Sequence, residues 1–264
     1  MCLECYYLGV PSPEKQIIAR IRALAGKKRN ALVRMGIGDD GAVLRPKSGS
    51  ELLVTTDFSL EGTHFRRDWH PAHSVGHRCL ARGLSDIAAM GGEPHAAFLS
   101  LALPARLPQS WVDGFLKGFL ALANLHGIQL AGGDVAESKA GVLADVMIVG
   151  SAPAGKAVLR SGARNGDILY VTGALGGVSA TLRQLLAGKK IAPKSAPRHF
   201  FPEPRVEVGR FLREKKFATA MIDLSDGLST DLAHVCSESG VGAVVNEFLL
   251  PISKGATLKD ALHG

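Results

Sequence analysis

Apolar residues recur at helical spacing in several parts of the chain. In residues 14–25 they fall on one side of a helix, and Gly26 stands where a helix would end. The clearest pattern covers residues 109–126, whose apolar side is formed by Val112, Phe115, Leu116, Phe119, Leu122 and Leu125. The same spacing predicts further helices over 74–90, 176–187, a stretch ending near Lys216, and 228–238.

Short apolar runs bounded by turn residues predict strands between these helices. In the first half they cover 51–56, 96–103, 128–131 and 142–149, and in the second half 167–172, 218–222 and 241–246. Residues 193–204 are expected to form a loop. Because helices and strands alternate in both halves, the predicted fold class is α/β (mixed α+β).

The regular patterns are interrupted near the middle of the chain. Residues 150–166 contain four Gly, one Pro and three basic residues without periodicity. We interpret this stretch as the passage between two domains, residues 1–152 and 153–264. A length of 264 residues is enough for two small domains.

Composition excludes several classes of protein. The chain has 31 Lys and Arg against 24 Asp and Glu, which gives a formal charge of +7. Because the basic residues are scattered, we expect a surface that favours small anions rather than nucleic acid. The sequence contains no run of 18 apolar residues, so no membrane span is predicted. We interpret Cys2 and Cys5 as part of a frayed terminus and not as a zinc or redox site. Four Cys in a chain of this length are too few for a disulfide scaffold and fit a reducing cytoplasm.

Aspartates stand beside Gly, Ser or Thr at the ends of apolar runs or at helix starts. They occur in Gly36–Gly41, Val54–Asp57, Leu84–Ile87, Ala131–Asp134 and Ile222–Gly227. One such segment is usually a turn or a helix cap, but five in one chain suggest that the acids converge. Converged carboxylates repel each other unless cations lie between them. Oxygen ligands without His or Cys favour Mg²⁺, which usually accompanies bound phosphate.

Two well-known nucleotide motifs are matched only in part. Gly36, Gly38 and Gly41 have the spacing of a dinucleotide fingerprint, but Asp39 and Asp40 between them would repel a pyrophosphate. Residues 150–156 nearly match a P-loop, yet Ala157 stands where that motif needs Ser or Thr. We therefore expect a nucleotide to be held in a different way.

Six motifs in order make the chain similar to a known family. GIGDDGAVL, TTDFSLEGTHF, LARGLSDIAAMGGEP, LAGGD, LRSGARNGD and IDLSDGLSTDLAHV together resemble the thiamine-monophosphate kinases, relatives of aminoimidazole ribonucleotide synthetase. The resemblance extends from about residue 13 to the end. It implies an N-terminal sheet that forms a barrel-like homodimer interface and a C-terminal α/β sandwich. ATP and several Mg²⁺ ions would lie between the halves, and ATP would phosphorylate thiamine monophosphate to thiamine diphosphate.

The resemblance also implies roles for individual residues. Positions matching metal ligands are Asp40, Thr55, Thr56, Asp57, Asp86, Asp134, Asp223 and Asp226, with Asp39 supporting Asp40. Positions matching nucleotide contacts are Gly133, Asp134, Arg160 and Ser225, and His64 matches a substrate contact. Plain alternatives remain open for some of them: the two threonines as strand residues, His64 as a surface residue and Arg160 as a loop charge. No general base is assigned.

The chain departs from the family pattern at its end. It stops at Gly264, whereas the family continues with a Gly-Glu-Asp-Tyr-Glu-Leu segment and a tail that contacts the substrate. We therefore expect the second domain to be incomplete, and metal and ATP binding are better supported than full activity. Two alternatives stay open: a related enzyme with another acceptor, and a non-catalytic ATP-binding module.

Overall fold

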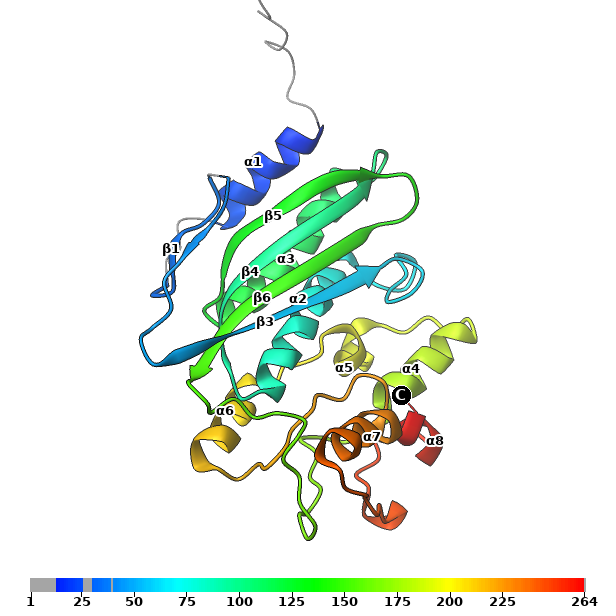
Figure 1. The fold of residues 1–264 in the computed structure, drawn as a ribbon. Coiled ribbons are helices and arrows are strands. Elements are labelled where there is room, and N and C mark those ends of the chain that lie inside the picture. Colours follow the sequence, from blue (N-terminus) through cyan, green and yellow to red (C-terminus); the bar gives the residue numbers. More distant parts are fainter. Residues whose placement is uncertain (1–12, 26–29, 39, 264) are drawn as a thin grey trace, which may run out of the picture.

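A four-stranded sheet organises the first half of the molecule (Figure 1). The computed structural model describes residues 13–25, 30–38 and 40–263, so Cys2, Cys5 and Asp39 lie outside the described residues. The strands are β3 (Ser50–Leu60), β4 (Glu93–Pro104), β5 (Gln129–Ser138) and β6 (Leu143–Pro153). Their order is β3-β6-β4-β5, with β6 antiparallel to both neighbours and β4 parallel to β5.

Two helices, α2 (Ala72–Ala89) and α3 (Gln109–Leu125), cover one face of this sheet (Figure 1). Their apolar sides and alternate strand residues form the main core, in which Phe115, Phe119 and Ile148 are fully buried. Glycines bring the two helix backbones unusually close. A Cβ atom on Gly76 would lie 1.9 Å from the Phe115 carbonyl oxygen, and one on Gly118 would lie 1.8 Å from the His73 carbonyl oxygen.

The opposite face of the sheet is covered only in part. The hairpin of β1 (Val33–Met35) and β2 (Val43–Leu44) packs over one end of it, around Ala96, Ala131 and Val149. Helix α1 (Pro13–Ala25) lies beside β5 and α3 and packs against the main core. On β3 three large apolar side chains remain exposed, namely Leu52, Val54 and Phe58. This part of the face is called the open face below.

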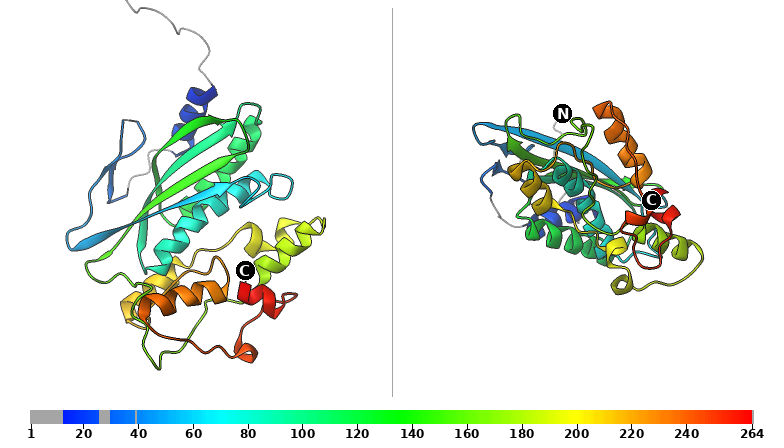
Figure 2. Two further views of the ribbon diagram at one scale, coloured as in Figure 1. Left: turned by 45° about the vertical axis from the view of Figure 1, so that its right-hand side comes forward. Right: turned by 90° about the horizontal axis from the view of Figure 1, so that it is seen from below.

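The second half, after residue 153, consists of short helices and irregular segments that lie against α2 (Figure 2). The helices are α4 (Gly177–Leu186), α5 (Pro197–Phe200), α6 (Val206–Lys215), α7 (Leu228–Ser239) and α8 (Leu258–His263), with 3₁₀ turns η1 (Pro193–Ser195) and η2 (Glu247–Leu249). Gly209 of α6 fixes the contact, because a Cβ atom there would lie 2.0 Å from the Ala88 carbonyl oxygen.

The predicted elements of the first half and the predicted helices are confirmed, with β3 and β5 longer than expected. The predicted strands at 167–172, 218–222 and 241–246 are wrong, since the structure describes these residues and forms no strand there. A strand needs a hydrogen-bonded neighbour, and these segments have only isolated bonds such as that from the Met221 amide to the Leu159 carbonyl oxygen. Several apolar side chains of the first and third segments stay exposed, with Tyr170 at 86% and Val244 at 96%, and those of 218–222 are half-buried.

The mixed α/β class is thus confirmed, whereas the second half shows no sandwich among its described residues. The loop expected at 193–204 contains α5, which starts with Pro197 at a position where the fixed φ of proline suits a helix. None of the described helices is long and apolar enough to cross a membrane.

Candidate active site

Three carboxylates from separate elements approach one another between β3, α2 and the loop before α7. Thr55 and Asp57 lie on the side of β3 that faces α2, as the alternation of a strand requires. The Thr55 hydroxyl donates a hydrogen bond to Asp86 of α2, and the Ser85 hydroxyl donates to Asp223 Oδ2 at 3.0 Å. We call Thr55, Asp57, Asp86 and Asp223 the acidic cluster.

Burial and mutual repulsion shift the proton affinity of two members of this cluster. Burial raises the pKa of Asp86, and the charges of Asp223 and Asp57 raise it further, against the hydrogen bond from Thr55 and the charge of Arg160. Burial also raises the pKa of Asp223, with the charges of Asp231 and Asp57 acting in the same direction against the Ser85 hydrogen bond. The folded chain therefore holds negative charge here at a cost in stability.

Removing one of these charges should stabilise the fold. Between the ordinary carboxyl pKa and the raised one, the folded state binds more protons than the unfolded state, so the free energy of unfolding falls as pH rises through this window. At pH 7, without Mg²⁺, we expect Asp86→Asn to raise the melting temperature by at most about 2–4 °C, because solvent screens part of the repulsion at this half-buried group. Thermal melts at pH 7 and below pH 4 test this, and a lower melting temperature at pH 7 would contradict it.

A buried acid holds the loop that carries Asp223. Asp231, in the first turn of α7, is 3% exposed, and its Oδ2 accepts hydrogen bonds from the backbone amides of Ser225 at 2.9 Å and Asp226 at 3.2 Å. The side chains of Ser225 and Asp226 are exposed beside the acidic cluster. Asp231 is absent from the predicted site, although an acid in the first turn of a predicted helix is a signal for such a contact.

Basic groups border the acidic cluster on two sides. Arg82, one turn before Asp86 on α2, places Nη2 3.1 Å from Asp57 Oδ1. The charge of Arg160 acts on Asp86 from the second half. The Nδ1 atom of His64 accepts a hydrogen bond from the Leu60 amide at 3.0 Å. The pKa of His64 is lowered, mainly by burial and then by the charge of Arg82, against the opposite effect of Asp57.

Three predicted metal-ligating residues lie apart from this cluster. Thr56 points to the opposite face of the sheet, where its hydroxyl donates to Asp145 Oδ1 at 2.8 Å. Asp134 is exposed on β5, three strand spacings or about 14 Å from β3. Asp40 is exposed in the turn between β1 and β2. Across the described ranges, no three His, Cys, Asp or Glu side chains are arranged to hold a metal ion.

Gly133, a predicted nucleotide contact, has a clear structural reason to be glycine. Its φ is +147°, and a Cβ atom there would lie 1.9 Å from the Leu99 carbonyl oxygen on β4. The next residue, Asp134, turns its Oδ1 back to accept from the Val135 amide at 2.9 Å. The backbone at this point of β5 is thus shaped by the close approach of β4.

Comparison with known proteins gives a consistent result. Residues 38–152 match the family described as AIR synthase related protein, N-terminal domain. Thiamine-monophosphate kinase from Salmonella typhimurium is 38% identical over 245 residues, which cover 88% of this chain and 74% of that protein.

Two solved structures extend the similarity to the fold. Thiamine-monophosphate kinase from Stenotrophomonas maltophilia superposes with a TM-score of 0.82 at 36% identity, covering 94% of this chain and 81% of that one. The structure described as AaThiL complexed with AMPPCP and TMP superposes with a TM-score of 0.76 at 31% identity, covering 95% of this chain and 81% of that one.

Proposed function

This chain belongs to the thiamine-monophosphate kinase family, and on that premise we propose that it transfers the γ-phosphoryl group of ATP to thiamine monophosphate, giving thiamine diphosphate and ADP. The observation that carries the proposal is the acidic cluster, formed by the family motifs and bordered by Arg82 and Arg160. It is supported by the structural relative complexed with AMPPCP and TMP.

The chemistry explains why charge dominates this site. Donor and acceptor are both phosphates, and two unit negative charges 4 Å apart repel by about 4 kcal/mol at an effective dielectric of 20. The second pKa of a phosphate monoester is about 6, so the attacking oxygen is largely deprotonated at neutral pH. The chain therefore has to position and neutralise the two groups rather than remove a proton.

We further propose Mg²⁺ as the cation of the acidic cluster. Its donors are all oxygen atoms, the ligands that Mg²⁺ prefers. Burial and then mutual repulsion raise the pKa of Asp86 and Asp223, and a cation between them would relieve the repulsion. Bound Mg²⁺ supplies charge neutralisation to the phosphates. Mg²⁺ is usually held by one or two carboxylates together with substrate phosphates, so two of Asp57, Asp86 and Asp223 would suffice, and the loop fixed by Asp231 keeps Asp223 in place.

The remaining ligands and the assembly state are also proposals. We propose that two copies pair through the open face, where Leu52, Val54 and Phe58 are between 43% and 61% exposed. Thr56 lies on that same face of the sheet. In this view residues 1–152 form the ATP, Mg²⁺ and dimerisation domain and residues 153–264 the second domain. Cys79 and Cys236 are both free, as suits a cytoplasmic location.

Incubation of the whole chain with ATP, Mg²⁺ and thiamine monophosphate tests the function. Chromatographic detection of thiamine diphosphate, absent when EDTA is added, is the expected result. Turnover only with another acceptor would assign the chain a different reaction, and ATP binding without any turnover would make it a non-catalytic module. Either of these results would overturn the proposal.

A further inference from the structure

We propose that Arg82 binds the phosphate of the acceptor, between the acidic cluster and His64. This inference rests on the proposed function and adds a residue that the family motifs did not bring into the predicted site. Three observations support it: the contacts of Arg82, its position near Asp57 and His64, and the fact that the neighbouring arginines bind other groups.

The side chain of Arg82 reaches the acidic cluster but is only partly engaged there. Its Nη2 lies 3.1 Å from Asp57 Oδ1, and its side chain remains 38% exposed. Its Nε is buried and has no hydrogen-bond partner. The ion pair therefore fixes the direction of the guanidinium group while leaving other donors of its planar fork unused.

The position of Arg82 lies between two predicted ligand sites. Asp57 on one side is a predicted metal ligand, and His64 on the other is a predicted substrate contact. His64 lies close to this part of α2, because Arg78, one turn before Arg82, donates from Nη2 to the His64 carbonyl oxygen at 3.4 Å. The charges of Arg82 and Asp57 both act on the His64 imidazole. If an acceptor binds at His64 with its phosphate directed toward the acidic cluster, that phosphate would lie near the guanidinium group of Arg82.

The other arginines nearby are engaged elsewhere. Arg78, one turn earlier on α2, donates to the backbone carbonyl oxygens of His199 and His64, and burial lowers its pKa to about 10. Arg66 pairs with Asp68 at 2.8 Å and lies 4.4 Å from the ring centre of Trp69.

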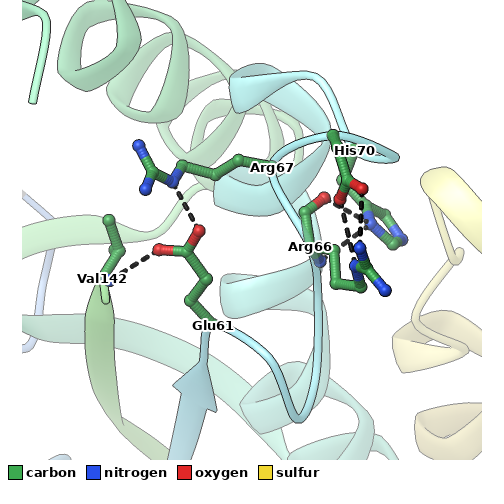
Figure 3. A network of polar contacts seen from close by, with 6 residues as sticks. Glu61, Arg66, Arg67, His70 and Val142 are labelled. Atoms are coloured by element: carbon green, nitrogen blue, oxygen red, sulfur yellow. Dashed lines mark hydrogen bonds and ion pairs between the residues drawn. The ribbon is translucent and has the colours of Figure 1, made fainter. Parts of the chain in front are cut away.

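Arg67 resembles Arg82 in forming a single ion pair and in the exposed fraction of its side chain. Its Nε lies 2.5 Å from Glu61 Oε1, and Glu61 also accepts from the Val142 amide at 2.9 Å (Figure 3). The Arg67 side chain is 39% exposed, almost the same as that of Arg82. It therefore offers a control with the same residue type, a single ion pair and equal exposure, away from the acidic cluster.

Guanidinium chemistry suits this role. An arginine fork can donate two parallel hydrogen bonds to a phosphate and is always charged, whereas lysine offers a point charge without that geometry. Replacing Arg82 should therefore weaken binding of the phosphorylated acceptor more than binding of the nucleotide, whose predicted contacts lie at Arg160 and Ser225.

Calorimetric titration of the whole chain, with Mg²⁺ present, tests this inference without relying on turnover. We expect Arg82→Met to raise the Kd for thiamine monophosphate by about 10–100-fold, the loss typical of a charged hydrogen bond, and to change the Kd for AMPPCP by less than about threefold. Arg82→Lys should give an intermediate Kd for thiamine monophosphate, and Arg67→Met should leave both values unchanged. Where Arg82→Met does not fold, Arg82→Lys carries the test.

Three results would overturn the role of Arg82: an unchanged Kd for thiamine monophosphate in the folded variant, an equal weakening of both ligands, or the same loss in Arg67→Met. A wild-type chain that binds thiamine monophosphate but forms no diphosphate would overturn the proposed function alone. A wild-type chain that does not bind it would overturn both.

Discussion

The variants Asp57→Asn and Asp86→Asn are each expected to lower the rate of thiamine diphosphate formation by at least about 100-fold, a typical loss when a group that stabilises transition-state charge is removed. Both residues belong to the acidic cluster, and Asn retains their shape while removing the charge that would hold a cation. The measurement is the initial rate at saturating ATP, Mg²⁺ and thiamine monophosphate.

A surface acid provides the control for these two variants. Asp68 also pairs with an arginine, Arg66, but its side chain is 56% exposed and it lies outside the acidic cluster. Asp68→Asn should keep the wild-type rate, and circular dichroism should show that all three variants are folded. Wild-type rates in both cluster variants would remove the carboxylates from the mechanism.

The variants Gly76→Ala and Gly118→Ala are expected to have the largest effects on stability. At each position a single added Cβ atom would come within 2 Å of a backbone carbonyl oxygen on the facing helix, at Phe115 and His73 respectively. Backbone atoms cannot yield as a flexible side chain can, so α2 and α3 would have to separate. We expect each variant to lose about 3 kcal/mol or more, at the upper end of overpacking effects, measured by chemical denaturation.

Gly242→Ala is the matched control, because a Cβ atom there would have nothing within 4 Å and its φ is not in the left-handed region. It should unfold at the same denaturant concentration as the wild type, or slightly higher, since alanine restricts the unfolded chain. Equal stability of all three variants would show that the helix pair is less tightly packed than described.

Much of the site follows from sequence, but the direction of side chains does not. The motifs identified Asp57, Asp86 and Asp223, which the fold brings together. They grouped Thr55 with Thr56, although neighbours on a strand point to opposite faces, and only Thr55 joins the acidic cluster. Asp134 lies apart because the strand order separates β5 from β3, and Asp40 stands in the turn of the separate β1–β2 hairpin. Neither the strand order nor the packing of the hairpin can be read from local patterns.

The second half shows a different limit. Apolar runs such as 167–172 have the composition of strands, yet strand formation depends on pairing with distant residues. Helices α4, α6 and α7 were predicted correctly because their hydrogen bonds are local. For Asp231 the sequence shows only an acid in the first turn of a predicted helix, whereas its support of the loop depends on its burial.

The close contact of α2 with α3 has a consequence for ligand binding. Arg82, Ser85 and Asp86 all stand on α2, whose backbone is locked against α3 through Gly76 and Gly118. The backbone positions of these three residues are therefore established when the chain folds, and contacts with Asp57, Asp223 and Thr55 orient their side chains. Little rotational freedom is left for them to lose when ligands arrive, so binding energy is spared for holding two anions together.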